Sequence, residues 1–196
     1  ILTKDELRAD QAEHPPFGSN LCISYEAIGR VHGTSGTTGN PTAFGVGKGD
    51  IQRIAEAHAR VMWAMGVRPD DIVFIGSFFS LYWGSWGAML GTERLGASAF
   101  PFGAGVPGQS ERAIEWMANV KPTVFYGTPS YSLYIAEKAR AMGYDPARDF
   151  NFRILFFSGE PGAGVPSTRK RIEETYDAVC LDSGSTGEMA PWMTDG

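Results

Sequence analysis

The sequence has few of the side chains from which disulfide frameworks and metal centres are built. Its 196 residues include only two cysteines, Cys22 and Cys180, which lack the spacing of a metal site. The three histidines are scattered along the chain. Because two cysteines are too few for a disulfide-stabilised secreted domain, we expect a reducing, cytoplasmic setting.

Positive charge is also scarce. Lys and Arg number 17 against 22 Asp and Glu, which gives a formal net charge of −5. No basic cluster exceeds the RKR at residues 169–171, which fits a solvated helix face. A nucleic-acid partner held through phosphate contacts is therefore not expected.

The sequence shows no signal peptide, and its longest uncharged stretch is a poor membrane segment. Residues 72–91 carry no charge over twenty positions, a length that could span a bilayer. Seven of those positions are Gly or Ser, however, and charged residues close both ends. A buried strand, a loop and a tightly packed helix explain this composition better, so we expect no membrane partner.

The most informative segment is HGTSGTTGNPT at residues 32–42, which has no apolar side chain to bury. Its flexible backbone, exposed N–H groups and hydroxyls suit the oxygens of a polyphosphate. It is not a Walker A loop, because no Gly-Lys-Ser/Thr follows the glycines. A polar surface loop or linker is the alternative. The candidate phosphate ligands are Thr34, Ser35, Gly36, Thr37, Thr38 and Gly39.

From residue 50 onward, helix-period and strand-like segments alternate, which predicts an α/β fold with a largely parallel sheet and flanking helices. Asp50 is expected to cap a helix that runs to Met65, and Ser110 to cap another. Thr128 and Pro129 form a cap and first-turn pair. The other expected helices cover 84–95 and 167–176, and the strands 72–75, 99–102, 123–126, 152–157 and 178–181.

Three unusual segments follow strands of this sheet: SFFSLYW at 77–83, SGEPG at 158–162 and DSGSTGE at 182–188. Ligands of parallel sheets bind beyond the carboxyl ends of the strands. We therefore expect these segments to line one crevice.

Ser-Gly-Thr-Thr-Gly-x-Pro-Thr at 35–42 resembles the phosphate-binding signature of the acyl-adenylating enzymes. The chain resembles one branch of them, the phenylacetate–CoA ligase family, nearly end to end. The matching stretches are LTKDELR (2–8), GVRPDD (66–71), GTERLGA (91–97), KPTVFYGTPSYSL (121–133) and SGEP (158–161). The resemblance implies that residues 1–196 are part of the large N-terminal ATP- and acid-binding domain of an adenylate-forming enzyme. The small C-terminal domain, with the catalytic lysine, is expected to lie outside the chain, as is the ribose-binding aspartate.

The resemblance also implies roles for residues in the nucleotide site. Residues 34–39 would bind the β/γ-phosphates, Thr186 the α-phosphate, and Glu188 a Mg²⁺ ion, which suits one carboxylate plus phosphate oxygens. The segment departs from the family pattern in two places: Ser183 stands where an aromatic residue is common, and Gly187 is inserted between Thr186 and Glu188. A Gly/Ser turn followed by an exposed glutamate is the alternative. The remaining implied nucleotide residues are Ser158, Gly159, Glu160 and Pro161 along the adenine, and Asp182, Ser183, Gly184 and Ser185.

Aromatic residues crowd the stretch from Phe78 to Trp86, where a plain core cluster is the alternative to a binding site. The family's pocket for the acid aligns with Phe79 and Tyr82, with Gly84 nearby. Large rings would leave a flat slot for an aryl acid such as phenylacetate.

The family chemistry implies ATP-dependent conversion of a carboxylic acid to an acyl-adenylate, followed by transfer to CoA, with Thr186 and Glu188 as the catalytic residues. The implied small molecules are the acid, ATP, Mg²⁺ and CoA, and a homodimer is compatible with this reading. Loading of a carrier protein in place of CoA is one alternative, and a non-catalytic nucleotide-binding relative is another.

Overall fold

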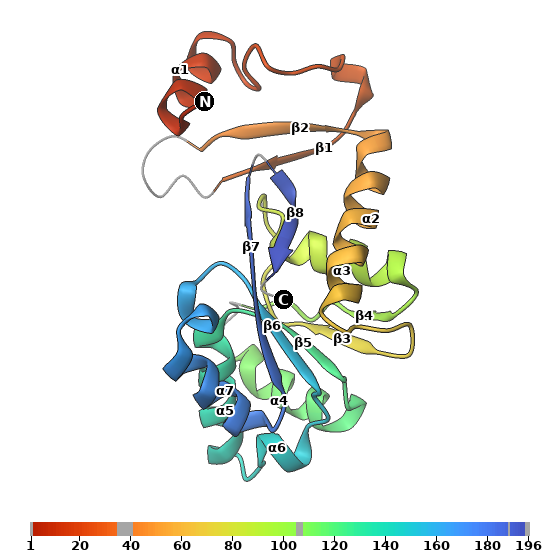
Figure 1. Cartoon of the computed structure of the whole chain (residues 1–196), viewed down its shortest axis with the longest axis vertical. Helices are drawn as coiled ribbons and strands as arrows, with labels where there is room; N and C mark the ends of the chain where they lie inside the picture. Colours follow the sequence, from red (N-terminus) through yellow and green to blue (C-terminus); the bar gives the residue numbers. More distant parts are fainter. Residues whose placement is uncertain (1, 35–40, 105–107, 188, 195–196) are drawn as a thin grey trace.

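Six strands form the central sheet of the computed structural model, which describes residues 2–34, 41–104, 108–187 and 189–194 (Figure 1). Their order across the sheet is β4-β3-β5-β6-β7-β8. The first five are parallel, and β8 runs antiparallel to β7. The expected α/β fold is confirmed. The strands are β3 (Ile72–Ile75), β4 (Ser98–Phe100), β5 (Val124–Gly127), β6 (Ile154–Phe157), β7 (Val179–Thr186) and β8 (Met189–Thr194).

Helices cover both faces of this sheet, because successive side chains of a buried strand point to opposite sides. In β5, Phe125 belongs to a buried cluster with Ile135 and Ile172, whereas Val124 belongs to a second cluster with Met62. The first face is covered by α4 (Gln109–Val120), α5 (Pro129–Ala141) and α7 (Pro166–Tyr176), and the second by α2 (Lys48–Ala64) and α3 (Gly84–Leu95). A short α6 (Pro146–Asp149) precedes β6.

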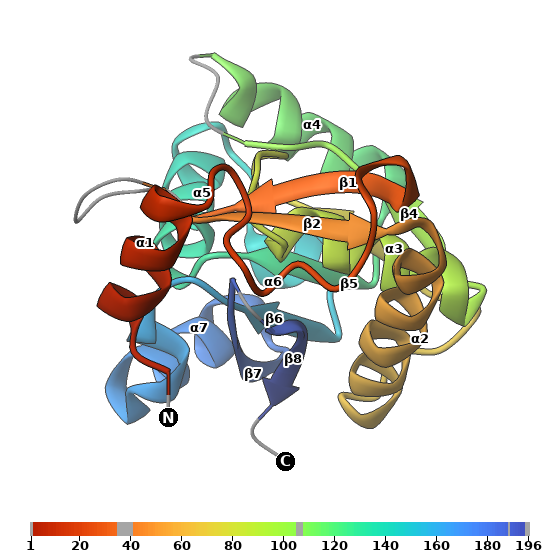
Figure 2. The same ribbon diagram turned by 90° about the horizontal axis from the view of Figure 1, so that it is seen from above.

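The N-terminal segment forms a separate antiparallel hairpin, which the sequence patterns did not predict. It consists of β1 (Ile28–Gly33) and β2 (Ala43–Gly47), preceded by α1 (Lys4–Glu13) and the 3-10 turn η1 (Tyr25–Ala27). The side-chain amide of Gln11 joins α1 to β2: its Nε2 donates to the Ala43 carbonyl at 2.7 Å, and its Oε1 accepts from the Ala43 N–H at 3.0 Å. The hairpin lies beyond the end of the sheet at which β7 finishes (Figures 1 and 2).

Two glycines let α3 pack closely against α2. A Cβ atom on Gly91 would lie 2.8 Å from the sulfur of Met62, and one on Gly87 would overlap the imidazole of His58. His58 is fully buried and its Nδ1 lies 2.8 Å from the Ile54 carbonyl oxygen. Side chains larger than hydrogen at these two glycines would push the helices apart.

The opposite end of the sheet is joined by a polar cluster around Asp71, just before β3. Thr123 Oγ1 donates to Asp71 Oδ1 at 2.7 Å, and the Arg68 N–H donates to Oδ2, also at 2.7 Å. Arg153, just before β6, donates from Nε at 3.0 Å and forms an ion pair through Nη2. Burial alone would raise the pKa of Asp71, but the hydrogen bonds from Arg153, Thr123 and Arg68 outweigh it, so the pKa lies below its usual value.

Several boundaries differ from those expected from the sequence. The helix over 84–95 is confirmed, but α2 begins earlier, with Gly47 as its N-cap. Asp50 is no cap: it lies in the first turn and accepts from Arg53 at 2.8 Å. The cap of α4 is Gly108, not Ser110, because φ is +80° at that position and favours glycine. The strand expected over 99–102 ends at Phe100.

The strand expected over 178–181 is the largest difference, because β7 continues to Thr186 by pairing with β8. None of the helices within the described residues is long and apolar enough to cross a membrane.

Candidate functional site

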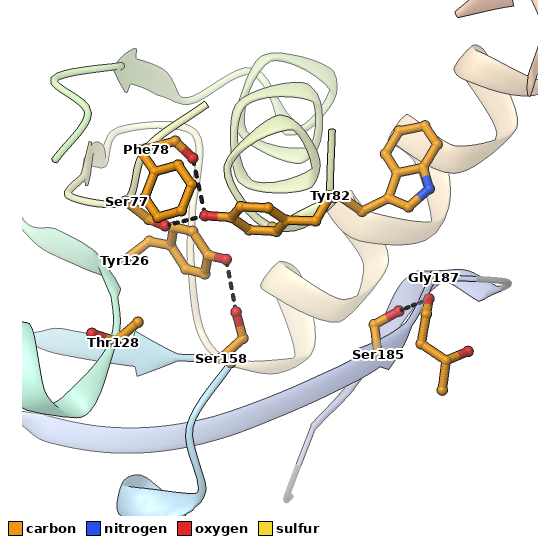
Figure 3. Close-up of a pocket in the computed structure, with 12 residues that line it drawn as sticks. Ser77, Phe78, Tyr82, Tyr126, Thr128, Ser158, Ser185 and Gly187 are labelled. Carbon is orange, nitrogen blue, oxygen red and sulfur yellow. Dashed lines mark hydrogen bonds between the residues drawn. The ribbon is translucent and has the colours of Figure 1, made fainter. Parts of the chain in front are cut away.

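A cavity of about 310 Å³ opens where the parallel strands finish (Figure 3). Its walls come from the segments that follow β3, β5 and β6 and from the end of β7, so the expected convergence of the segments at 77–83, 158–162 and 182–188 is confirmed. The lining residues are Ser77, Phe78, Tyr82, Trp83, Gly84, Tyr126, Thr128, Ser158, Gly159, Ser185, Thr186 and Gly187.

The loop between β3 and α3 is fixed by its own hydroxyl groups. The hydroxyl of Ser85, in the first turn of α3, lies 2.9 Å from the Ser77 carbonyl oxygen and 2.8 Å from that of Phe78. The Tyr82 phenol donates to the Phe78 carbonyl at 3.0 Å and lies 2.8 Å from Ser77 Oγ (Figure 3). These contacts hold the rings of Phe78 and Tyr82 edge to face at 5.3 Å along one wall.

A pair of hydroxyls reaches the cavity from the neighbouring strands. The Tyr126 phenol of β5 lies 2.7 Å from Ser158 Oγ, directly after β6. Burial raises the pKa of Tyr126, so the phenol stays protonated and can donate a hydrogen bond at neutral pH. Gly84 leaves room for this pair, because a Cβ atom there would lie 2.6 Å from the Tyr126 oxygen and 2.6 Å from the Tyr82 ring.

Of the predicted acid-pocket residues, Tyr82 and Gly84 line the cavity, and Phe79 is not among its lining residues. The ring of Phe79 packs edge to face on Trp86 at 4.9 Å and against the buried cluster beneath α3. Phe78, which is 53% exposed, and Trp83 supply the aromatic wall in its place. Phe78 therefore lines the cavity at the place where Phe79 was expected from the sequence.

Only part of the predicted adenine segment, residues 158–161, lines the cavity. Ser158 and Gly159 line the cavity, and Gly159 has φ of +87°, a turn that favours glycine. Glu160 turns aside and accepts from Ser130, at 3.1 Å from its N–H and 2.7 Å from its hydroxyl. Pro161 begins the 3-10 turn η2 (Pro161–Gly164).

Thr128 is the N-cap of α5, as expected, and accepts from the Tyr131 N–H at 3.3 Å. It also lines the cavity. Thr128 thus both caps α5 and forms part of the cavity wall.

The predicted segment over 182–185 belongs to strand β7. Its first residues pair with neighbouring strands, and only its last residue lines the cavity. Asp182 pairs in register with Phe157, and Ser183 is buried and donates to the Phe157 carbonyl at 2.7 Å. Gly184 is exposed and pairs with Met193 of β8. Ser185 and Thr186, farther along, reach the cavity. The serine in place of the family's aromatic residue therefore joins β7 to β6.

Thr34 directly follows β1 and lies close to the tip of β7, because its Cγ2 is 3.0 Å from a Cβ atom built on Gly187. It accepts from the Thr42 N–H at 3.1 Å. The other predicted phosphate ligands, Ser35, Gly36, Thr37, Thr38 and Gly39, lie outside the described residues, as does Glu188.

Ser77 and Trp83 lie in the segment 77–83 that was expected to line the crevice, but neither was predicted individually, and Tyr126 was not predicted at all. For Tyr126 a signal was present: a phenol in the otherwise apolar strand VFYG, immediately before the Thr128-Pro129 cap. A buried phenol needs a hydrogen-bond partner, and the end of a parallel strand places that partner at the binding edge.

Comparisons with known proteins agree with this geometry. No protein-family model matches the chain. The chain is 35% identical over 188 residues to a phenylacetate–coenzyme A ligase of Aromatoleum evansii, which covers 96% of this chain and 41% of that protein. It is 34% identical to the enzyme of the same name from Escherichia coli K12, with coverage of 95% and 40%.

Among solved structures, a 2-hydroxyisobutyryl-CoA ligase in complex with 2-HIB-AMP and CoA shares 54% identity with a TM-score of 0.94, over 98% of this chain and 44% of that one. The chain thus spans about two fifths of the length of the relatives it matches. By sequence and fold, it belongs to the phenylacetate–CoA ligase family of the acyl-adenylating enzymes.

Proposed function

We propose that this chain carries the nucleotide- and acid-binding part of an enzyme that activates a carboxylic acid with ATP and passes the acyl group to CoA. The observation that supports this most directly is the single cavity shared by the ends of β3, β5, β6 and β7. It combines an aromatic wall with hydroxyls and backbone turns, as an acid beside a nucleotide would require. The relatives described with bound acyl-AMP and CoA support the same chemistry.

In the first step, a carboxylate oxygen attacks the α-phosphorus of ATP and pyrophosphate leaves. In the second, the sulfur of CoA attacks the acyl carbonyl carbon and AMP leaves. Both steps depend on positioning and on neutralising negative charge more than on a nucleophilic side chain. The hydroxyl of Thr186 would donate to the α-phosphate from the cavity wall, and residues 34–39 would donate to the β- and γ-phosphates.

Magnesium is part of this proposal. Glu188 would hold the ion together with phosphate oxygens, a ligand set that suits Mg²⁺. The ion would neutralise phosphate charge during attack. The proposal rests on the position of this glutamate two residues after Thr186, which lines the cavity.

For the acid itself, we favour a small 2-hydroxy acid. A hydroxyl on C2 could bond to the Tyr126–Ser158 pair, whose oxygens lie 2.7 Å apart at the cavity wall. The 54% identity to a 2-hydroxyisobutyryl-CoA ligase, against 35% for a phenylacetate ligase, points the same way.

An aryl acid is the second candidate, supported by the rings of Phe78, Tyr82 and Trp83 in the cavity. If it is correct, Tyr82→Ala should raise KM for the best aryl acid and leave KM for ATP little changed. Phe79→Ala serves as the matched control, because the Phe79 ring packs on Trp86 outside the cavity lining.

The full-length protein would decide among these alternatives. Pyrophosphate release should be measured with 2-hydroxyisobutyrate, isobutyrate, phenylacetate and acetate, followed by thioester formation with CoA or with a carrier-protein thiol. Release with the hydroxy acid and transfer to CoA is expected. Release without transfer to CoA would favour the carrier-protein alternative, and no release with any acid would favour a non-catalytic relative.

Two further expectations belong to this proposal. A reducing, cytoplasmic setting is supported by the two cysteines of the described residues, exposed Cys22 and buried Cys180, which do not form a disulfide. A homodimer would be tested by sedimentation of the full-length protein.

A further inference from the structure

We propose that His32 is a positioning residue for the acid site and acts through Trp83. This inference rests on the proposed function, because it concerns the wall of the cavity in which the acid would bind. His32 comes from β1, far from Trp83 in the sequence, and it is not itself a lining residue of the cavity.

The two side chains form a close stack. Their ring centroids lie 3.6 Å apart with an interplanar angle of 18°, and both side chains are buried. Two hydrogen bonds to the Leu81 carbonyl oxygen add to this stack. Nδ1 of the His32 ring lies 2.8 Å from that oxygen, and the backbone N–H of Gly33 donates to it at 2.9 Å. His32 and Gly33 of β1 therefore hold the loop over residues 77–83 through a side-chain ring and through a backbone hydrogen bond.

The imidazole has a defined proton arrangement. A carbonyl oxygen can only accept, so Nδ1 carries the hydrogen and donates to Leu81. Burial lowers the pKa of His32; the hydrogen bond to Leu81 opposes this, and the charge of Arg30 acts in the same direction as burial. The ring is accordingly neutral at physiological pH, and a flat neutral ring stacks on indole without a buried charge to desolvate.

Trp83 connects this contact to the acid. Trp83 lines the cavity together with its neighbours Tyr82 and Gly84. Trp83 is also the residue before the first turn of α3, and its carbonyl accepts from the Gly87 N–H at 2.6 Å. A shift of the indole would therefore change the width of the acid pocket.

The test separates the ring from the hydrogen bond in the full-length enzyme. His32→Ala should raise KM for the preferred acid by roughly five- to tenfold, with a smaller change in KM for ATP and in kcat, as loss of one stacking contact would produce. His32→Phe keeps the flat ring and should recover most of the affinity. His32→Asn keeps a donor near Leu81 and should recover less. Val31→Ala, a neighbouring and half-exposed position, is the control.

A double-mutant cycle identifies the partner. If His32 acts through Trp83, His32→Ala should have little further effect on acid KM in a Trp83→Leu background. Additive effects would overturn the proposal, as would an unchanged acid KM in a folded His32→Ala enzyme. Should the alanine variant fail to fold, the phenylalanine and asparagine variants supply the same comparison.

A physical measurement keeps this inference distinct from the proposed function. Acrylamide quenching of Trp83, taken as the difference from a Trp83→Phe protein, should increase in His32→Ala and not in Val31→Ala. If quenching increases in His32→Ala but the full-length protein has no ligase activity, the contact between His32 and Trp83 is supported and the proposed chemistry is rejected. Unchanged quenching would reject the contact even in an active enzyme.

Discussion

Gly187, at the end of β7, lies close to Thr34, which follows β1. A Cβ atom on Gly187 would stand 3.0 Å from Cγ2 of Thr34 and 3.0 Å from Cε2 of Phe44. The glycine that departs from the family spacing is thus the residue that lets the tip of β7 approach the hairpin. Thr186 lies next to the start of the predicted phosphate segment as a result.

Enlarging Gly187 should move these two segments apart. We expect Gly187→Val to raise KM for ATP by roughly three- to tenfold, because overpacking displaces Thr34 or Phe44 by a fraction of an ångström or more. Steady-state kinetics of the full-length protein measures this. Gly49→Val is the control, since no atom lies within 4 Å of a Cβ built at Gly49. Equal effects of the two variants would contradict the contact.

The hydroxyls of the predicted phosphate segment can be removed with little change in volume. Thr37→Val combined with Thr38→Val should weaken ATP binding by roughly 1–3 kcal/mol, the scale of hydrogen bonds lost to a charged group. Isothermal titration with ATP gives the affinity, and circular dichroism checks the fold. An unchanged affinity in a folded protein would show that this segment does not bind the phosphates.

Glu188 decides whether the metal site is complete. Glu188→Gln keeps the size of the side chain and removes the charge that Mg²⁺ requires. Adenylation by the full-length protein should fall on the order of tenfold or more, and higher Mg²⁺ should partly restore it. Turnover like that of the wild type would mean that another carboxylate holds the ion.

The Tyr126–Ser158 pair is expected to recognise the hydroxyl of the acid. Tyr126→Phe should reduce the preference for 2-hydroxyisobutyrate over isobutyrate, measured as the ratio of kcat/KM values, by roughly three- to tenfold. The wild-type rate with isobutyrate should change little. Tyr134→Phe, a half-exposed phenol on α5, controls for loss of a hydroxyl in general. A preserved ratio would remove the pair from substrate recognition.

Asp71 should make stability depend on pH in the acid range. Its folded-state pKa lies below the ordinary value of 3.8, so its contribution is complete above that pH and is lost as the pH falls through the lower folded value. Asp71→Asn should therefore lower the free energy of unfolding at pH 7 by about 1–3 kcal/mol. The difference between the proteins should shrink below about pH 4 in urea titrations.

The strands and the edge at which they meet could be predicted because apolar runs such as Val73–Ile75 leave little choice of structure. The β1–β2 hairpin could not, since alternation in Ile28–Gly33 is interrupted by two glycines and a histidine. The polar residues after Leu181 did not predict that β7 continues to Thr186. Ser183 remains in a strand only because β8 pairs alongside and the Phe157 carbonyl accepts its hydroxyl proton.

Within the site, the sequence identified the segments and not every side chain. Tyr82 and Gly84, predicted as residues of the acid pocket, both line the cavity, whereas Phe79 packs on Trp86 and Phe78 lines the cavity. Which of two adjacent aromatic residues faces a cavity depends on loop hydrogen bonds such as Tyr82 to Phe78, and local patterns do not encode these.

The close packing of α2 on α3 has a consequence for how substrate range could change. Gly87 and Gly91 place the backbone of α3 directly against His58 and Met62, so a shift of this helix toward α2 would bring it into a clash with these two side chains. The floor of the cavity at Gly84 is fixed with it. Under the proposed function, a different acid would then be accommodated by replacing individual side chains in residues 77–83 while α3 stays in place, which makes this loop the place to begin a redesign.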